Sequence, residues 1–446
     1  MDFVNREKEL SKISNCFNSN KPDFMVIYGR RRVGKSELIK KAIEDRKDSV
    51  YFQATESTPQ VQLSNFIDSV SKSFPEAENL KDDWEVLLNH LAEKDATVVI
   101  DEFPFLVEGD DSLSSVFQRF WDQQDSSMNL VLIGSSISVM EDKVLSGSSP
   151  LYGRWTEKID LKPLNFDDAE IFFQSFEPEE RFEMWSIFGG TPQYLEFIDQ
   201  KKTFEENVSD LLLDEDGRFR EEPEFLLRME LSKPQRYMSI LKAIASGNTK
   251  RNEIAQATGI ENSSIGTYLS KLERLQFVKR KIPVTEEAPR SRRGLYKISE
   301  PLTRFWFRFI FGNEDSIALN DNPFEDIVKP EINHFASESF EELCIQKLPE
   351  LLDREYRKIG GWWHQEHEID VVGLKDNGKI LGECKYTESK VGKTLLDKLK
   401  DKEEELRVEG STEYVLFSKS GFTQELEEHS ETREDVFLFE LNDMID

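Results

Sequence analysis

The 446 residues are enough for two to four domains, at about 100–200 residues per domain. A hydrophobic content of 38%, with 32 phenylalanines, can form several cores, but no apolar run approaches the ~18 residues of a membrane span. The first residues contain no apolar signal-peptide core, and the three cysteines are too few for a disulfide framework. These features argue against membrane-spanning and disulfide-stabilised secreted proteins, so we expect a cytoplasmic protein with reduced thiols.

The net charge of −29 is unevenly distributed along the chain. Residues 1–230 carry −21 and residues 313–446 carry −18, whereas residues 231–312 carry +10. A basic segment inside an acidic protein is typical of local contact with a polyanion. Residues 231–312 are therefore a candidate DNA-binding region. The alternative is that these cations pair with acidic residues of the same chain.

The first part of the chain alternates short apolar strands with amphipathic helices. Residues 24–28, 97–100 and 130–133 are continuous apolar runs, as in buried parallel strands. Helical periodicity covers residues 63–74 and 113–121 between them. This alternation predicts an α/β core over residues 1–165, with a parallel sheet and helices on both faces.

The rest of the chain divides into three further predicted domains. Residues 166–230 are helical throughout, which predicts an all-α lid. Residues 231–312 predict three helices and a basic hairpin, the outline of a winged helix, with helices near residues 233–246, 251–258 and 263–275. Residues 313–446 return to a small α/β pattern, with a helix over residues 335–348 and strands over residues 369–372, 380–384 and 413–417.

A phosphate-binding loop follows the first predicted strand. The pattern G-x-x-x-x-G-K-[ST] is matched by Gly29, Arg30, Arg31, Arg32, Val33, Gly34, Lys35 and Ser36. The two glycines let the backbone approach phosphates closely, and a helix N-terminus follows. Lys35 would contact the β- and γ-phosphates of ATP, and the Ser36 hydroxyl would bind Mg²⁺.

Polar side chains end the other two predicted strands. Asp101 and Glu102 come directly after the apolar run of residues 97–100, and Ser135 follows the next strand. Asp101 would bind the hydrated metal, and Glu102 would polarise the attacking water. The Ser135 hydroxyl would contact the γ-phosphate. The alternative for Asp101 and Glu102 is an exposed acidic turn.

These motifs resemble the archaeal-type ATPase family, a branch of the STAND group of AAA-related NTPases. The resemblance rests on residues 3–10, 29–36, 100–104, 150–154 and 189–195. It implies ATP hydrolysis with Mg²⁺ and makes nucleotide-dependent formation of a homo-oligomer a hypothesis to test. It also implies that Arg154 contacts the γ-phosphate and that Pro192 lies in a turn placing the lid against the nucleotide. The alternative for Arg154 is an ordinary surface cation.

Within the basic segment, residues 262–271 would form the recognition helix of the winged helix. Phosphate contacts would come from cations around it, namely Lys250, Arg251, Lys279, Arg280 and Lys281. Arg290, Arg292 and Arg293 would form an arm that enters the minor groove. The alternative is a winged helix that docks proteins only.

The C-terminal segment contains a second group of acidic residues. Glu341 lies on a predicted helix, and Asp370 and Glu383 lie on consecutive predicted strands, with Lys385 two residues on. Three carboxylates could share Mg²⁺ or Mn²⁺, and Lys385 could orient a water. The order resembles the PD-(D/E)xK nuclease superfamily, although Ile369 replaces the usual proline. The alternative is a salt-bridge network in an inactive relic.

The leading hypothesis is an ATP-driven molecular switch that acts on DNA through the winged helix. The first alternative is a nucleotide-gated DNA endonuclease that uses the C-terminal carboxylates. The second alternative is a non-catalytic DNA-binding regulator that responds to ATP occupancy.

Overall fold

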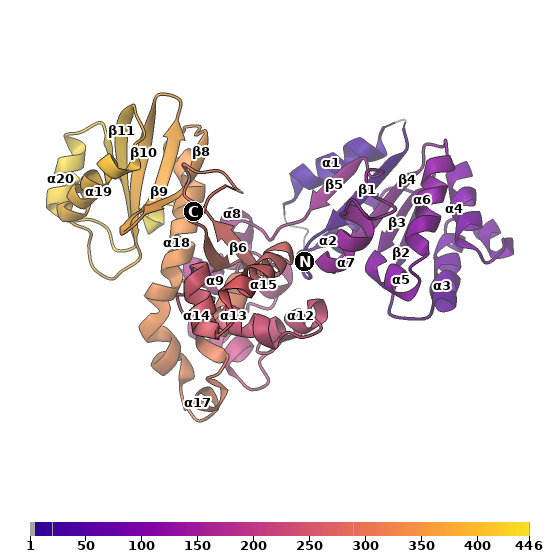
Figure 1. Cartoon of the computed structure of the whole chain (residues 1–446), viewed down its shortest axis with the longest axis horizontal. Helices are drawn as coiled ribbons and strands as arrows, with labels where there is room; N and C mark the ends of the chain where they lie inside the picture. Colours follow the sequence, from indigo (N-terminus) through magenta and orange to yellow (C-terminus); the bar gives the residue numbers. More distant parts are fainter. Residues whose placement is uncertain (1–4, 20, 289, 446) are drawn as a thin grey trace. The chain divides into compact units, whose positions relative to one another are not determined.

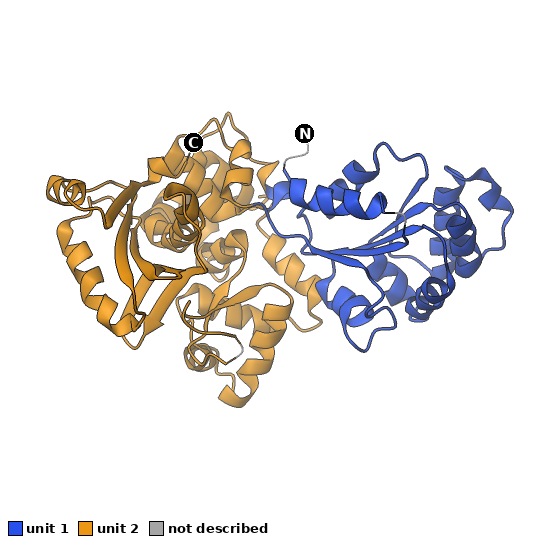
Figure 2. Cartoon of the chain, turned by 90° about the horizontal axis from the view of Figure 1, so that it is seen from above, with its two compact units in different colours: residues 1–164, 191–194 blue, residues 165–190, 195–446 orange. Residues whose placement is uncertain are grey.

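The structure, a computed structural model, describes residues 5–19, 21–288 and 290–445, which form two compact units (Figure 2). Unit 1 comprises residues 1–164 together with Thr191–Tyr194, apart from the undescribed positions. Unit 2 comprises residues 165–190 and 195–446 with the same reservation. The predicted division into four domains is finer than these two units and stays a prediction.

Unit 1 is built on a five-stranded parallel sheet with the strand order β2-β3-β4-β1-β5 (Figure 1). The strands are β1 (Asp23–Tyr28), β2 (Ser49–Gln53), β3 (Thr97–Asp101), β4 (Asn129–Gly134) and β5 (Glu157–Asp160). The three predicted strands are present as β1, β3 and β4. This confirms the predicted α/β class with the parallel sheet of a P-loop NTPase. All carboxyl ends of the strands lie at one edge, where polar side chains can converge.

Helices cover both faces of this sheet because its central strands are apolar on both sides. They are α1 (Glu7–Phe17), α2 (Lys35–Ile43), α3 (Pro59–Ser71), α4 (Trp84–Glu93), α5 (Phe103–Gly109), α6 (Leu113–Gln123) and α7 (Ile137–Met140). Met25 and Ile27 of β1 pack with residues of α1 and α2, whereas Phe24 and Val26 pack with α3 to α6. Alternate residues of one strand thus belong to two separate cores.

The first half of unit 2 is helical. Its helices are α8 (Phe166–Ala169), α9 (Pro178–Phe188), α11 (Phe204–Val208), α12 (Glu222–Glu230), α13 (Gln235–Ala245), α14 (Arg251–Thr258) and α15 (Asn262–Arg274), and α10 (Pro192–Leu195) lies at the boundary. Two antiparallel strands follow α15, β6 (Val278–Lys281) and β7 (Leu295–Ile298). The three helices and the hairpin predicted for the basic segment are therefore present.

The second half of unit 2 has its own five-stranded sheet of mixed direction, in the order β12-β11-β10-β9-β8 (Figure 1). Its strands are β8 (Lys358–His364), β9 (His367–Lys375), β10 (Gly378–Lys385), β11 (Ser411–Ser418) and β12 (Val436–Glu440). Its helices, with two that lead into it, are α16 (Pro301–Phe305), α17 (Glu314–Ala318), α18 (Ile332–Leu351), α19 (Lys393–Leu406) and α20 (Gln424–Glu431). Among the described residues, no helix is both long and apolar enough to cross a bilayer.

Candidate functional site

The loop between β1 and α2 requires glycine at both ends. Gly29 has φ 147°, and a Cβ there would lie 2.4 Å from the backbone carbonyl oxygen of Leu161. Gly34 has φ 92° and is the N-cap of α2. Both φ values fall where side chains are strained, so the loop can close tightly only with glycine at these positions.

The Lys35 side chain lies inside this loop and is only 4% exposed. Its ammonium group donates hydrogen bonds to the carbonyl oxygens of Gly29, at 2.9 Å, and Arg30, at 2.7 Å. Nearby in the loop, Nε of Arg31 is buried and has no hydrogen-bond partner. The enclosed ammonium of Lys35 and the unpaired, buried N–H of Arg31 lie in one loop, and together they suit a polyanionic ligand such as a nucleoside triphosphate.

Asp101, at the end of β3, joins the loop to two neighbouring elements. Its Oδ2 accepts hydrogen bonds from Ser36 Oγ and from Tyr51 Oη, each at 2.5 Å. Burial and then the Asp101 carboxylate raise the pKa of Tyr51, so this phenol stays a neutral donor. A hydroxyl and a carboxylate oxygen that meet in this way fit the oxygen ligands preferred by Mg²⁺. The sequence analysis missed Tyr51 because β2 was not predicted.

Glu102 lies at the same edge of the sheet, between β3 and β4. Its backbone is left-handed, with φ 55°, and this directs the carboxylate toward the end of β4. Ser135 fixes the carboxylate through its hydroxyl, at 2.6 Å, and its backbone N–H, at 3.3 Å. Ser36, Asp101, Glu102 and Ser135 therefore form one connected group at the carboxyl ends of β3 and β4.

The remaining predicted residues of the ATP site have different environments. Val33 is buried in the core under α2, and Arg32 lies over the ring of Tyr194, 5.8 Å from its centroid. Pro192 lies in the Thr191–Tyr194 segment that belongs to unit 1. Arg154 binds Asp122 of α6 through Nε, at 2.7 Å, and Nη2, at 2.8 Å. Arg154 would have to exchange this partner to reach a nucleotide, so its role stays a prediction.

The C-terminal carboxylates contact lysines. Lys385 Nζ lies 3.1 Å from Glu383 Oε2 and 3.7 Å from Asp370 Oδ2, which also accepts the backbone N–H of Cys384 at 2.9 Å. Lys402 of α19 pairs with the other oxygen of Glu383. Glu341 lies on α18, where burial and then Asp370 raise its pKa to about 8.

The structure brings Asp370, Glu383 and Lys385 together, and the metal predicted for this cluster stays a prediction. Among the described residues, no three His, Cys, Asp or Glu side chains form a group that could hold a metal ion. The two lysines supply the positive charge next to Glu383, where the sequence analysis expected Mg²⁺ or Mn²⁺. We therefore assign no catalytic step to Glu341, Asp370 and Glu383.

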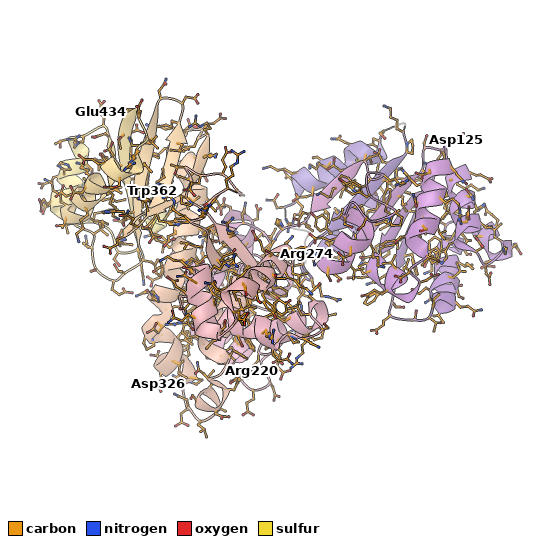
Figure 3. All side chains as sticks on the ribbon, in the orientation of Figure 1. Asp125, Arg220, Arg274, Asp326, Trp362 and Glu434 are labelled. Atoms are coloured by element: carbon orange, nitrogen blue, oxygen red, sulfur yellow. The ribbon has the colours of Figure 1, made fainter. Side chains whose placement is uncertain are left out.

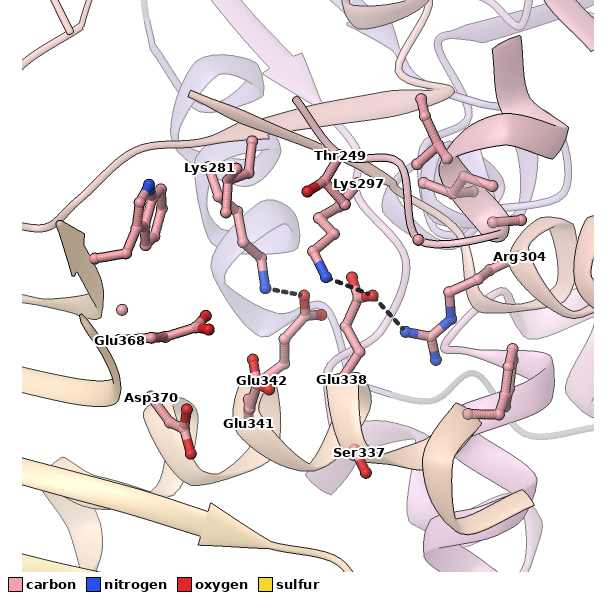
Figure 4. Close-up of a pocket in the computed structure, with 18 of the residues that line it drawn as sticks. Thr249, Lys281, Lys297, Arg304, Ser337, Glu338, Glu341, Glu342, Glu368 and Asp370 are labelled. Carbon is pink, nitrogen blue, oxygen red and sulfur yellow. Dashed lines mark hydrogen bonds and ion pairs between the residues drawn. The ribbon is translucent and has the colours of Figure 1, made fainter. Parts of the chain in front are cut away.

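A cavity of about 680 Å³ in unit 2 is lined by residues of both the basic hairpin and α18 (Figure 4). Lys281 on β6 pairs with Glu342 of α18 at 2.9 Å, and Lys297 on β7 pairs with Glu338 at 3.1 Å. Burial by itself would raise the pKa of Glu338, but Arg304 and Lys297 outweigh it and lower the pKa to about 2. The hairpin is thus fastened to α18 by partly buried ion pairs.

These pairs agree with the alternative stated for the basic segment, that its cations pair with acidic residues of the same chain, and contact of these cations with DNA stays a prediction. Lys279 and Lys281, predicted to contact DNA phosphates, both pair with Glu342. Arg293, predicted to enter a minor groove, pairs with Glu286 and donates to the carbonyl oxygen of Trp363. The sequence could not show this because the carboxylates of α18 lie about 60 residues further along the chain.

Comparison with known proteins identifies the family. The profile of an ATPase domain found predominantly in Archaea matches residues 3–198, and a profile of archaeal and bacterial proteins of unknown function matches residues 306–399. An uncharacterized protein of Methanocaldococcus jannaschii is 37% identical over 397 residues, which is 87% of this chain and 88% of that protein. The chain belongs to this archaeal ATPase family.

The other matches cover a smaller part of the chain or have a lower sequence identity. An uncharacterized ATP-binding protein of M. jannaschii is 51% identical over 45 residues, 10% of this chain and 76% of that protein. The Aeropyrum pernix ORC2 protein, solved as ADPNP–ADP complexes, is 13% identical with a TM-score of 0.47, over 71% of this chain and 94% of that one. A Thermotoga maritima RuvB variant is 16% identical with a TM-score of 0.35, over 63% and 90%.

Proposed function

We propose that the protein binds ATP with Mg²⁺, hydrolyses ATP, and uses this cycle as a molecular switch that acts on DNA through residues 231–312. The observation that supports hydrolysis is the connected group of Ser36, Asp101, Glu102 and Ser135 beside the Lys35 loop. A loop alone would support binding. A positioned carboxylate at the end of β3, which is separated from β1 by β4 alone, adds a group that can act on water.

Each residue has a distinct role in this proposal. Lys35 exchanges the carbonyl oxygens of its own loop for phosphate oxygens of ATP. Ser36 and Asp101 hold Mg²⁺, which supplies positive charge to the phosphates when it is bound. Glu102, oriented by Ser135, orients the attacking water and accepts its proton.

Lys35→Ala tests the nucleotide site directly. Loss of two charge-assisted hydrogen bonds, each worth about 1.5–3 kcal/mol, should weaken Mg-ATP binding on the order of 100-fold or more. Isothermal titration calorimetry measures the affinity. Lys41→Ala is the matched control, because Lys41 is exposed on the same helix and pairs with Glu44. Equal affinity of the Lys35→Ala variant and the wild type would contradict the site.

Glu102→Gln separates hydrolysis from binding. Glutamine keeps the size of the side chain but cannot accept a proton, so phosphate release should fall by about 10²–10⁴-fold while Mg-ATP binding is retained. A coupled phosphate-release assay and calorimetry on the same variant measure both quantities. Hydrolysis at the wild-type rate would exclude Glu102 as the group that activates water.

The DNA part of the proposal rests on the +10 charge of residues 231–312 and on their arrangement as three helices and a hairpin. We interpret this arrangement as a winged helix with α15 as its recognition helix. Cleavage of DNA by the C-terminal domain is not favoured, because lysines already neutralise Glu383. That domain would then transmit or receive the nucleotide-dependent change.

A further inference from the structure

The cations of the basic segment differ in the partners of their side chains. Lys279, Lys281 and Lys297 on the hairpin pair with carboxylates of α18. In contrast, Lys233, Arg236 and Lys271 form no ion pair with any carboxylate among the described residues and are accessible to solvent. Other cations of the segment, such as Arg251 and Arg280, also form no ion pair within the part of the chain that the structure describes, but they donate to backbone carbonyl oxygens. Lys233, Arg236 and Lys271 differ because they lie around one cavity, where their positive charge is available to a ligand.

The three unpaired cations surround one cavity. It has a volume of about 510 Å³ and is lined by Leu231, Ser232, Lys233, Gln235, Arg236, Tyr237, Tyr268 and Lys271. Among the described residues, no acidic side chain lines it, and its volume is within the range of about 300–1,000 Å³ found for small-ligand sites. Arg274, labelled in Figure 3, lies one helical turn beyond Lys271 on α15.

Two aromatic rings line this cavity. Tyr237 of α13 and Tyr268 of α15 are half-buried, with ring centroids 5.2 Å apart and an interplanar angle of 67°. Arg236 lies over the ring of Tyr268 and donates to its hydroxyl at 2.5 Å, and Lys271 lies over the ring of Tyr237. Burial and then Tyr268 raise the pKa of Tyr237, so the phenol of Tyr237 stays neutral.

We propose that this cavity binds an unpaired nucleotide of a single-stranded nucleic acid. The rings of Tyr237 and Tyr268 contact the base, and Lys233, Arg236 and Lys271 bind the adjoining phosphates. Aromatic platforms with flanking cations are the usual means of holding single strands, since every base has a face that can stack. A base inside a duplex is stacked on its neighbours and cannot reach rings recessed between two helices.

This inference rests on the proposed function and deepens it, because it names the contact site and the form of nucleic acid. It also differs from groove recognition by α15. Groove recognition reads the base edges of a duplex, whereas the rings and cations of this cavity would contact the face of a base and its phosphates.

The test uses the full chain and fluorescence anisotropy with a labelled oligothymidine of about 20 nucleotides, an abasic strand of equal length, and a duplex. We expect the oligothymidine to bind at least tenfold more tightly than the duplex. Tyr268→Ala should weaken oligothymidine binding about tenfold through lost stacking but leave abasic-strand binding unchanged. Tyr268→Phe, which keeps the ring, should bind oligothymidine like the wild type and shows that the fold tolerates substitution here.

The contribution of the cations to binding is measured separately, through the salt dependence of the affinity. Lys271→Ala should lower the slope of log affinity against log salt by about 0.7, the value for one phosphate contact on a single strand. Lys398→Ala is the control, because Lys398 is exposed on α19 and does not line the cavity.

Two results would overturn the inference in different ways. If no nucleic acid binds, with or without Mg-ATP, both the inference and the DNA part of the proposed function fail. If nucleic acid binds but prefers the duplex, or is insensitive to Tyr268→Ala and Lys271→Ala, the proposed function survives and the cavity is excluded as the contact.

Discussion

At the scale of single residues, lysine has opposite uses in the two sites. The ammonium group of Lys35 donates to carbonyl oxygens of its own loop. It can exchange these neutral acceptors for phosphate oxygens, so its charge remains available to a ligand. Lys402 instead pairs with Glu383, a carboxylate only 4% exposed. A buried carboxylate left without its partner is strongly unfavourable, so Lys402 is expected to stabilise the fold.

Lys402→Ala should therefore lower the free energy of unfolding by about 2–3 kcal/mol. This is below the range of about 3–5 kcal/mol for breaking a buried pair, because Lys385 still contacts Glu383. Urea denaturation followed by circular dichroism measures the change. Lys398→Ala, on an exposed position of α19, should change stability by less than about 0.5 kcal/mol. Equal effects of the two substitutions would contradict this role of Lys402.

At the scale of secondary-structure elements, prediction succeeded where periodicity was uninterrupted. β1, β3 and β4 are continuous apolar runs, and α15 lies within one residue of its predicted bounds at each end. β2 was missed because its residues alternate between buried and partly exposed, and β5 because only one of its four residues is buried. The P-loop residues and Asp101 could be predicted, since a local motif specifies them. Tyr51 could not, since its contact with Asp101 depends on the pairing of β2 with β3.

Helix α9 carries a buried carboxylate that makes stability depend on pH. Glu183 accepts a hydrogen bond from the hydroxyl of Tyr386 at 3.3 Å, and burial, then Glu179, raise its pKa to about 7. An unfolded chain releases this proton near pH 4.5. Between these two values the folded state holds a proton that the unfolded state has lost, so stability falls as pH rises from about 4.5 to about 7.

The melting temperature should accordingly be higher at pH 5 than at pH 8, apart from the contributions of other groups. Glu183→Gln should remove this component, which is up to about 3 kcal/mol for a shift of this size. Comparing the pH dependence of the variant with that of the wild type by differential scanning calorimetry isolates it. Glu196→Gln, an exposed glutamate of unit 2, should leave the pH profile unchanged.

At the scale of the whole molecule, the charge pattern indicated a basic segment but not the partners of its cations. Glu338 and Glu342 neutralise the hairpin from a helix far along the chain, and no local pattern reveals this. The pairing of Glu383 with Lys402 was not predicted for the same reason, since Lys402 comes from α19, and the metal site of the C-terminal cluster stays a prediction. Ion pairs between residues far apart in the sequence could therefore not be predicted, whereas elements specified by a local motif could be.

The left-handed backbone at Glu102 has a consequence for substitutions at this position. A residue other than glycine held at φ 55° is less stable there by on the order of 1 kcal/mol. Glycine at this position would relax the turn and raise thermal tolerance, yet it would remove the carboxylate. Glu102→Gly should therefore unfold at a higher temperature than the wild type and, under the proposed function, lose ATP hydrolysis.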